Sequence, residues 1–478
     1  MTISKNIKQL VCGSVLFPLS NSLLNRKGIM NMYREALKTQ KMSQEFINKI
    51  QLNKFQNVIS YAYTNVPYYK EMFDSIGLKP GDIKHLKDIE GIPSLTRQDV
   101  IENRKQLFDT RYLNSIDFAE QSSGGPGEFV PFARFNKFKL TKSMPSGSTD
   151  KPTVLYENAK INASTWAQEL RLRQWFNVKP GAKEARLSRI AADIFPNSTK
   201  VRLREIFWNQ LLLPGVNLSE FDNRSNYHKI TYFKPDVVWG LTSSLTNLAE
   251  SMLNNNLKFS SYQPKVCVTW GAPLYDYEKK LIKRMFRCPV TNIYGSRDVG
   301  HIAALCPHGS MHINQETLYI ETDKNIEGLS GIDDGEIIAT TLEQTPMPLI
   351  RYRMGDIGEI KKSSCSCGMN LQVLKNIRGK TGEIFITQDG RMISPNFWRR
   401  TFMEKEIADA IKRFQIRYTK KGNVKILLVK HNAYTSKTEM TLKKLIKNKF
   451  NSDIKISINP VESIRPKISG KHEIVVHE

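Results

Sequence analysis

Cysteines and long apolar runs are scarce in this sequence. Its 478 residues include six cysteines, too few for a disulfide-built scaffold of this size. No run of about 18 apolar residues occurs, which argues against a transmembrane helix. The stretch from Leu10 to Leu19 is apolar but short, and it contains Ser14 and Pro18. We interpret it as a packing helix that could also lie on a membrane, with a cleaved signal peptide as the weaker alternative. We expect a cytoplasmic protein and leave membrane association open.

Acidic residues are scarce relative to basic ones. The chain has 71 Lys and Arg against 46 Asp and Glu, a formal net charge of +25. Such an excess favours a polyanionic partner, such as an acidic glycan, an anionic membrane or a nucleotide substrate. Because no Lys/Arg-rich run of the nucleic-acid type and no RNA-binding motif is present, we expect no nucleic-acid partner. A solvated basic surface without a dedicated partner is the simpler explanation.

The remaining composition is that of a globular protein with more than one domain. Hydrophobic residues make up 40% and charged residues 24% of the chain, which excludes wholesale disorder, collagen and coiled coil. Strand-like and helix-like runs alternate from Val237 onward, as is typical of an α/β layered fold. The clearest strands are predicted at 237–240, 265–270, 289–294, 335–342, 351–360 and 383–386, and the clearest helices at 245–252 and 279–286.

The C-terminal part has its own alternation of elements. A strand is predicted at 424–429, a basic helix at 441–450 and another strand at 454–458. We therefore predict two domains, a large α/β domain at 1–378 and a small α+β domain at 379–478.

A candidate phosphate loop is the run Ser146-Gly147-Ser148-Thr149-Asp150-Lys151. Small hydroxylated residues around a glycine let backbone amides and hydroxyls close on phosphate oxygens, while a lysine supplies charge. Taken alone, such a run is more often a plain loop. A similar run, Ser122–Glu128, is a rival for the same role.

Three further segments carry polar groups suited to a nucleotide. Tyr294-Gly295-Ser296-Arg297-Asp298 follows a predicted strand, where open α/β sheets bind ligands, and Asp298 could hold Mg²⁺. Asp356 could accept hydrogen bonds from ribose hydroxyls. Lys471 follows Gly470 near the C-terminus and could reach an anionic transition state. Each has a plainer explanation: a strand-to-turn junction, a turn, or a solvated tail.

The order of these segments resembles the adenylate-forming (AMP-dependent) ligase superfamily, in its phenylacetate–CoA ligase and CapK-like branch. The resemblance covers most of the chain. It rests on Ile59–Ala62, Val66–Tyr69, Ile92–Thr96, the Ser146 loop with Pro152–Tyr156, Lys234–Asp236, Trp270–Leu274, the Tyr294 segment, Pro348–Asp356, Gly379-Lys380 and Gly470-Lys471. It implies an α/β fold with a large layered N-terminal domain of mixed sheets and a small mobile α+β C-terminal domain.

The resemblance also implies site residues. In the ATP site, the phosphate loop would be formed by Ser146, Gly147, Ser148, Thr149 and Lys151. The adenine would be lined by Gly271, Ala272 and Pro273, with Tyr294 stacked on it and Gly295 next to it in the same segment. Ser296 would touch the α-phosphate or the carboxylate, Asp356 would bind the ribose, and Lys380 would replace the usual assisting arginine. Lys471 would be the catalytic lysine, and Asp298 stands where the family usually has a magnesium-binding glutamate.

Two departures from the family pattern bear on activity. Asp150 replaces the usual phosphate-loop glycine and puts a like charge beside the triphosphate. The run Gly379–Glu383 lacks the paired aspartates usual at the hinge between the domains. We therefore predict adenylation more firmly than transfer to CoA.

Two short clusters offer metal ligands. Cys306, His308 and His312 lie in one, and Cys365 and Cys367 in the other. Three cysteines and a histidine would complete a tetrahedral structural zinc site, with Cys306, His312, Cys365 and Cys367 as our choice and His308 as the rival histidine. Free buried cysteines are the alternative, although similar Cys/His pairs in CapK-like relatives favour zinc.

We expect an AMP-forming ligase that uses ATP and Mg²⁺, contains a structural Zn²⁺, and activates a small carboxylic acid for transfer to an amine in cell-surface polysaccharide biosynthesis. An aryl-acid ligase that uses CoA as the thiol acceptor is the alternative. A hypothesis of another class is a non-catalytic relative whose basic face binds an acidic glycan or a membrane. His301 could face the acyl pocket or be packed, and Trp166, Trp175 and Trp239 are predicted core residues.

Overall fold

The computed structural model describes most of the chain in two compact units. The described residues are 9–17, 19, 28–115, 140–143, 154–188, 205–216, 218–324, 334–362, 365–380, 385–386, 392–393, 395–402, 407, 410–418, 423–431, 433–449, 455–464 and 474–477. The first unit comprises residues 1–320, 339–353 and 361–374, and the second comprises 321–338, 354–360 and 375–478. The predicted boundary at 378/379 stays a prediction.

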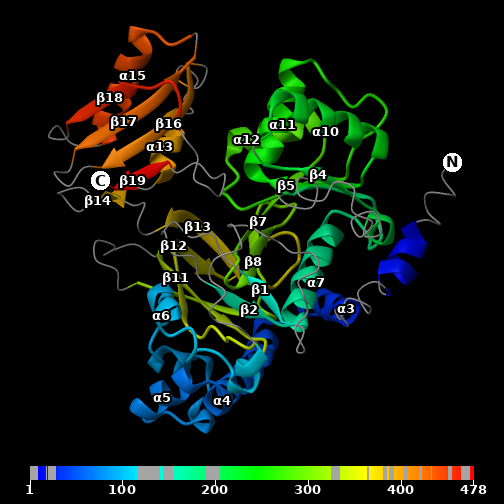
Figure 1. The fold of residues 1–478 in the computed structure, drawn as a ribbon, viewed down its shortest axis with the longest axis vertical. Helices are drawn as coiled ribbons and strands as arrows, with labels where there is room; N and C mark the ends of the chain where they lie inside the picture. Colours follow the sequence, from blue (N-terminus) through cyan, green and yellow to red (C-terminus); the bar gives the residue numbers. More distant parts are fainter. Residues whose placement is uncertain are drawn as a thin grey trace. The chain divides into compact units, whose positions relative to one another are not determined.

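Helices make up the described N-terminal part of the first unit (Figure 1). They are η1 (Cys12–Leu16), α3 (Ile29–Thr39), α4 (Gln44–Asn65), α5 (Pro67–Ser75), η2 (Pro80–Asp82), η3 (Leu86–Gly91), α6 (Arg97–Glu102) and η4 (Thr110–Ser115). Ser43 starts α4 by accepting a hydrogen bond from the amide of Phe46. The helix ends at Asn65 because Val66, which precedes a proline, is extended, and Pro67 then opens α5.

An 11-stranded sheet is the framework of the α/β part, in the order β10-β11-β12-β13-β9-β8-β7-β6-β5-β3-β4. The strands are β3 (Glu184–Ser188), β4 (Gln210–Pro214), β5 (Val237–Leu241), β6 (Val266–Trp270), β7 (Val290–Ser296), β8 (Gly300–Leu305), β9 (Met311–Ile313), β10 (Leu318–Asp323), β11 (Gly335–Thr341), β12 (Tyr352–Lys361) and β13 (Val373–Lys380). Strands β3 to β7 pair in parallel, and β7, β8 and β9 pair antiparallel. Strands β10, β11, β12 and β13 each contribute residues to both units.

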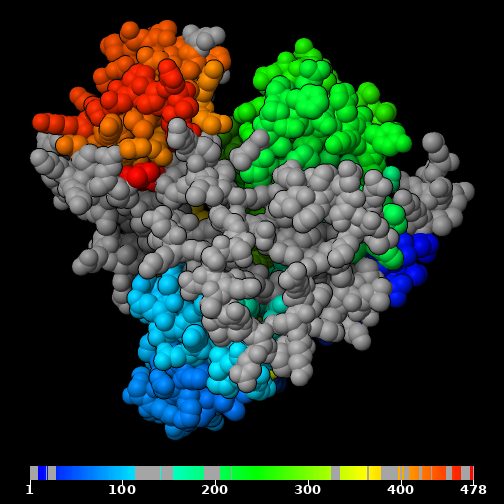
Figure 2. All heavy atoms as spheres, in the orientation of Figure 1, coloured from blue at the N-terminus to red at the C-terminus, as the bar shows by residue number. Residues whose placement is uncertain are grey.

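Helices connect the parallel strands, as parallel pairing requires. They are α10 (Glu220–Phe233), α11 (Thr242–Asn254) and α12 (Asp276–Phe286), and α7 (Ala159–Trp175) follows the small sheet of β1 (Thr141–Ser143) and β2 (Leu155–Glu157). α10 and α12 each contact α11, and together the three form a continuous surface, green in Figure 2. Among the described residues, no helix has both the length and the hydropathy needed to cross a membrane.

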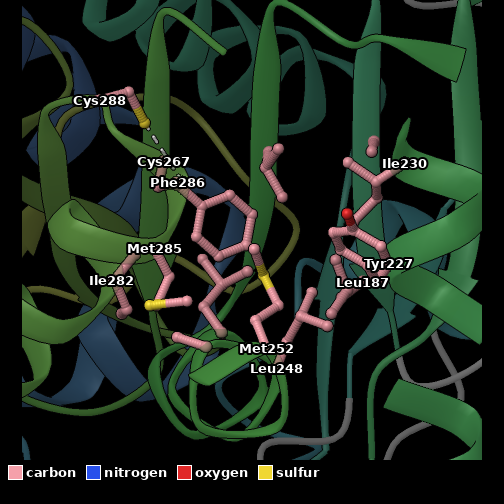
Figure 3. Packing of buried hydrophobic residues seen from close by; sticks show 14 of the residues in the cluster. Leu187, Tyr227, Ile230, Leu248, Met252, Cys267, Ile282, Met285, Phe286 and Cys288 are labelled. Carbon is pink, nitrogen blue, oxygen red and sulfur yellow. Dashed lines mark hydrogen bonds between the residues drawn. The ribbon is translucent and has the colours of Figure 1, made fainter. Parts of the chain in front are cut away.

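Apolar side chains fill the space between this helical layer and the sheet (Figure 3). Leu248 and Met252 of α11 and Phe286 of α12 are completely buried there. Two cysteines take part in this core, with the Sγ atoms of Cys267 and Cys288 at 3.5 Å. The strands are buried on both faces, which explains their continuous apolar runs in the sequence.

The second unit contains a separate four-stranded sheet in the order β18-β17-β16-β19. Its elements are β14 (Phe385–Ile386), β15 (Met392–Ile393), α13 (Pro395–Phe402), β16 (Ile411–Tyr418), β17 (Val424–Lys430), α15 (Ser436–Lys449), β18 (Ile456–Pro460) and β19 (Val475–His477). Trp398, Leu442 and Ile446 are fully buried in its own apolar core.

The mixed α/β architecture with a C-terminal α+β part confirms the predicted fold class. The strands expected around 237–240, 265–270 and 289–294 are present as β5, β6 and β7. Trp166 and Trp239 are buried core residues as predicted, whereas Trp175 is only partly buried. The strands β8 and β9, which flank Cys306 and His308 and include His312, were not predicted.

The core under α11 supports a matched test of packing. Leu248 is 0% exposed and Leu253, on the same helix, is 39% exposed. We expect Leu248→Ala to lower the free energy of unfolding by about 2–5 kcal/mol, because it leaves a cavity. Leu253→Ala should change it by less than about 0.5 kcal/mol. Urea unfolding of both variants measures this, and equal losses would contradict the packing described here.

Candidate active site and metal-ligand cluster

The loop after β6 holds the residues assigned to the adenine. Gly271 has a φ of +80°, and a Cβ atom there would lie 2.8 Å from the Leu241 side chain. The carbonyl of Ala272 accepts hydrogen bonds from Thr242 Oγ1 at 3.1 Å and Asn292 Nδ2 at 3.2 Å. Ala272 and Pro273 are exposed, so the loop is fixed to its neighbours while presenting a free edge.

The end of β7 lies beside this loop, because β6 and β7 pair in parallel up to Trp270 and Ile293. Tyr294 is half-buried and the next residue, Gly295, is exposed. A Cβ atom on Gly295 would lie 2.3 Å from the carbonyl oxygen of Gly300 on β8. Two polypeptide backbones therefore touch here, and only glycine fits.

The turn from β7 to β8 is organised by a hydroxyl group. Ser296 Oγ accepts hydrogen bonds from the amides of Asp298 at 3.1 Å and Val299 at 3.3 Å. This Ser-turn fixes the backbone that carries Asp298. The resemblance assigned Ser296 to the α-phosphate or the carboxylate, and the hydroxyl hydrogen is still available to donate.

Asp298 belongs to a polar group assembled from three distant segments. The hydroxyl of Tyr352, at the start of β12, hydrogen-bonds the Asp298 carboxylate. Burial, with a contribution from the charge of Asp298, raises the pKa of Glu157 to about 7. Glu157 ends β2, six residues after the candidate phosphate loop in the sequence. The sequence analysis did not identify Glu157 as a site residue, although it directly follows the motif Pro152–Tyr156.

Three sequence motifs that are far apart in the chain meet in the first unit. The Tyr69 hydroxyl donates to the Pro348 carbonyl at 2.8 Å and accepts from the Ile350 amide at 3.1 Å. Leu95 forms a β-bridge with Tyr352. These contacts hold the start of β12, and with it the Tyr352 hydroxyl, against the N-terminal helices.

Other predicted residues lie elsewhere or outside the described part of the chain. Asp356 is on β12 within the second unit, where the neighbouring Gly355 amide donates to Glu336 Oε1 at 3.2 Å. Lys380 is the last residue of β13, and its side chain is outside the described residues. The same holds for Ser146, Gly147, Ser148, Thr149 and Lys151, for the rival run Ser122–Glu128, and for Lys471.

Cys306, His312, Cys365 and Cys367 come together in the first unit. One ligand atom from each lies within 4.8 Å of all the others. The Sγ atoms of Cys306 and Cys365 are 3.7 Å apart, and Cys367 Sγ is 3.2 Å from His312 Nε2. A tetrahedral zinc with bonds of about 2.3 Å to sulfur would separate two sulfurs by about 3.8 Å. The rival His308 instead lies 2.9 Å from Ser366 Oγ and outside the cluster.

The backbone around the cluster orients its histidine. His312 Nδ1 is 3.1 Å from the Leu371 carbonyl, which fixes the proton on Nδ1 and leaves Nε2 facing the sulfurs. Burial lowers the pKa of His312, and the charge of Arg171 adds to this, so the imidazole is neutral near pH 7. Residue 312 on β9 also pairs with Val373 on β13.

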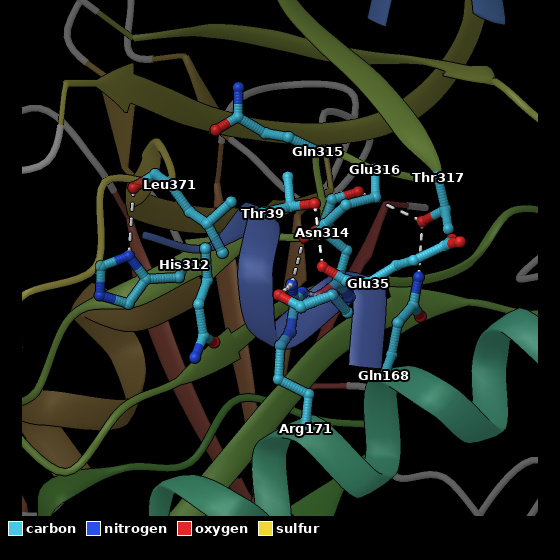
Figure 4. A network of polar contacts seen from close by, with 12 residues as sticks. Glu35, Thr39, Gln168, Arg171, His312, Asn314, Gln315, Glu316, Thr317 and Leu371 are labelled. Carbon is cyan, nitrogen blue, oxygen red and sulfur yellow. Dashed lines mark hydrogen bonds and ion pairs between the residues drawn. The ribbon is translucent and has the colours of Figure 1, made fainter. Parts of the chain in front are cut away.

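A polar network extends from this region to β8 (Figure 4). The fully buried Arg171 donates to Asn314 Oδ1 and to Glu316, and Asn314 Nδ2 donates to the His301 carbonyl at 2.8 Å. The side-chain amide of Gln168, on α7, donates to the hydroxyl of Thr317, three residues after Asn314. Arg171 belongs to no recognisable sequence motif, so the sequence analysis did not identify it as part of this network.

A second buried charge network lies beside His301. Arg173 and Arg186 pair with Glu169 and Glu184 at 2.6 to 3.1 Å. Burial alone would raise the pKa of Glu184, but the two arginines lower it to about 2. Burial lowers the pKa of His301, and its Nδ1 has no hydrogen-bond partner among the described residues. The sequence had suggested His301 as an acyl-pocket residue or a packed one, and the structure places it beside these ion pairs.

Comparisons with known proteins agree with the fold. The CapK C-terminal domain family matches residues 385–478. The chain is 23% identical to Protein CapK of Staphylococcus aureus, over 74% of this chain and 72% of that protein. It is also 23% identical to the phenylacetate–coenzyme A ligase of Escherichia coli K12, over 83% and 84% of the two chains. A crystal structure of 2-hydroxyisobutyryl–CoA ligase with an acyl-AMP superposes with a TM-score of 0.70, at 17% identity, over 92% and 91% of the two chains.

The fold and the relatives together define an AMP-forming ligase. More specifically, the chain is similar over most of its length to CapK and to the phenylacetate–CoA ligases, which supports a place in that branch of the adenylate-forming ligase superfamily.

The contact between the β7 and β8 backbones leads to a direct test. Gly295→Ala should lower the free energy of unfolding by about 1–3 kcal/mol, because the Gly300 carbonyl cannot move aside as a flexible side chain would. It should also weaken ATP binding, measured by calorimetry. Gly91→Ala is the matched control, since a Cβ atom there meets nothing within 4 Å. A Gly295→Ala protein with unchanged stability and ATP affinity would contradict the close contact.

Proposed function

We propose that this ligase adenylates a small carboxylic acid and then transfers the acyl group to an amine during cell-surface polysaccharide biosynthesis. The observation that supports the first step, adenylation, is the structure of the turn after β7. It places Asp298 beside Tyr352 and Glu157, at the sheet edge that also carries the Gly271–Pro273 loop. Ligands of open α/β sheets bind at this edge, beyond the carboxyl ends of the strands.

In the proposed adenylation, a carboxylate oxygen of the acid attacks the α-phosphorus of ATP. Pyrophosphate leaves, and the product is a mixed anhydride of the acid and AMP. Gly271, Ala272 and Pro273 would border the adenine, with Tyr294 stacked on its face. Lys471 and the loop Ser146–Lys151 would neutralise negative charge that grows on the phosphate oxygens in the transition state.

The proposed metal partner of ATP is Mg²⁺, held by Asp298 with Glu157 as a second carboxylate. Two carboxylates close enough to influence each other's ionisation form a donor set of the hard oxygen type that Mg²⁺ prefers. When bound, Mg²⁺ supplies positive charge to the phosphates. Tyr352, by donating to Asp298, would keep the carboxylate oriented towards the turn. Asp298 has one methylene fewer than the glutamate usual in the family, and Glu157 could compensate for its shorter reach.

In the proposed second step, an amine nitrogen attacks the acyl carbonyl, AMP leaves, and the nitrogen loses a proton to give an amide. The match of residues 385–478 to the CapK C-terminal domain supports this acceptor, as does the altered hinge sequence at Gly379–Glu383. CoA is the second candidate acceptor. It is favoured by the similarity to the phenylacetate–coenzyme A ligase of Escherichia coli, which extends over most of both chains.

Pyrophosphate release is the measurement that tests adenylation. Purified protein with ATP and Mg²⁺ would be given aryl acids, uronic acids and amino acids, with hydroxylamine to trap the acyl-adenylate. We expect release with one class of acid and a loss of about 100-fold or more in Lys471→Ala, because that residue provides the transition-state cation. Lys467→Ala, four residues earlier in the same segment, is the control and should keep its activity.

The same assay separates the acceptors. Faster AMP release on addition of an amine-bearing sugar, but not of CoA, supports amide formation, whereas the reverse supports a thioester ligase. Absence of both ATP binding and pyrophosphate release would overturn adenylation and favour a non-catalytic relative.

We also propose that Cys306, His312, Cys365 and Cys367 hold a structural Zn²⁺. Three thiolates and one neutral imidazole at mutual distances within 4.8 Å suit four-coordinate zinc. The ion would join the segment after β8 to the segment before β13. It would stand beside the Arg171 network without facing the β7 turn, so its proposed role is stability.

Metal analysis tests this site. We expect about one zinc per chain in the purified protein and less than about a tenth of that in Cys367→Ser, because three ligands bind zinc much more weakly than four. Cys288→Ser is the matched control: it removes a buried cysteine from the α12 core but leaves the cluster intact. Equal zinc contents in the two variants would rule the site out.

A further inference from the structure

An apolar patch lies on the surface near the N-terminus. In the described helical segment 9–17 and at residue 19, four aliphatic side chains point outward: Leu10 is 68%, Val11 39%, Val15 54% and Leu19 49% exposed. Residues 11, 15 and 19 are four apart, a spacing that puts them on one helical face. Ile206, 61% exposed, belongs to the neighbouring helical turn. We call these five residues the N-terminal apolar patch.

The opposite face of the segment is fixed to the first unit. Phe17 is buried, and its ring centroid lies 6.3 Å from that of Trp166 and 5.6 Å from that of Trp208. Trp208 is two residues after Ile206, so the contact between Phe17 and Trp208 connects the segment of Ile206 to the N-terminal helical segment. The segment is blue in Figures 1 and 2, and its atoms are visible at the surface.

Two glycines bring the helix backbone into direct contact with the body of the unit. A Cβ atom on Gly13 would lie 2.5 Å from the Pro180 carbonyl oxygen, and one on Gly181 would lie 2.3 Å from the Gly13 nitrogen. A contact of this closeness leaves the helix little freedom to roll. The aliphatic face is therefore held outward, and the segment cannot bury it by turning over.

The sequence that flanks residues 10–19 is basic, whereas Glu205 stands beside Ile206. Residues 1–34 include five Lys and Arg and no Asp or Glu, in a chain of net charge +25. Aliphatic side chains flanked by basic residues are the pattern of a helix that lies in the interface of an anionic membrane. The patch has no Trp, Tyr or Arg, the residues that dominate protein–protein hot spots, which disfavours a protein partner. The described segment 9–17 has nine residues, five of them in the π-helix η1, far fewer than the roughly 20 that a membrane-spanning helix needs.

We propose that the N-terminal apolar patch docks the enzyme on the surface of an anionic lipid membrane, without spanning it. Leu10, Val15 and Ile206 would enter the region between headgroups and acyl chains, and the net positive charge of the chain would favour anionic lipids. The docking does not depend on the proposed reaction, so it can fail while adenylation holds, and the reverse.

Vesicle flotation of the full-length protein tests the proposal. Vesicles of phosphatidylcholine with about 30% phosphatidylglycerol would be compared with phosphatidylcholine alone, at low and high salt. We expect the wild type to float with the anionic vesicles, and the bound fraction to fall at least tenfold in L10S/V15S. The control F221S/Y232S removes two aromatic side chains that are 80% and 91% exposed on α10 and should float like the wild type.

Three outcomes would overturn membrane docking. They are no flotation of the wild type, equal flotation of L10S/V15S and the wild type, and a wild-type dimer in sedimentation that L10S/V15S abolishes without any lipid binding. The last would assign the patch to a second copy of the chain. Pyrophosphate release and a thermal melt of L10S/V15S, both expected unchanged, show that lost flotation is not lost folding.

Discussion

The contact between the backbones of Gly295 and Gly300 is the constraint on which the rest of the candidate site depends. It brings β7 and β8 together without side chains between them. The turn that joins them is thereby kept short, and Ser296 can close it through the amides of Asp298 and Val299. Asp298 is then presented to Tyr352 and Glu157 from a rigid support. A bulkier residue at position 295 would displace all of these groups together.

The same hairpin connects the sheet edge proposed to bind ATP to the cysteine cluster. β8 begins at the Gly300 contact and ends one residue before Cys306. Midway, the His301 carbonyl is held by Asn314, which is held by the buried Arg171. Buried charges are expensive unless they are paired and hydrogen-bonded, and here each arginine has a carboxylate or amide partner. The pairing fixes where α7 can lie against the sheet, because a shift of one residue would leave charges unmatched.

Sequence reasoning predicted the parallel strands well because those strands are buried on both faces and read as continuous apolar runs. It missed β8 and β9, since Gly300–Ile313 mixes glycine, cysteine and histidine and its strands are defined by partners in space. Gly271, Tyr294 and Asp298 were predicted as site residues from ordered motifs. Glu157, Arg171 and the Arg173–Glu184 pair were not, because their roles arise only when α7, β2 and β3 are packed. The sequence analysis preferred His312 and kept His308 as its rival, and only the fold showed which imidazole reaches the sulfurs.

The hydrogen bonds of Tyr69 also have a consequence for how the chain is made. Its partners Pro348 and Ile350 are 279 and 281 residues away, and Gln51 and Lys54 of α4 likewise bind residues beyond 315. At a synthesis rate of about 5–20 residues per second, roughly 15–60 s pass before these partners leave the ribosome. During that interval α4 and α5 lack the surface that covers them, so the N-terminal helices are a natural client for chaperones. Although they are made first, they are among the last parts of the first unit to reach their final contacts.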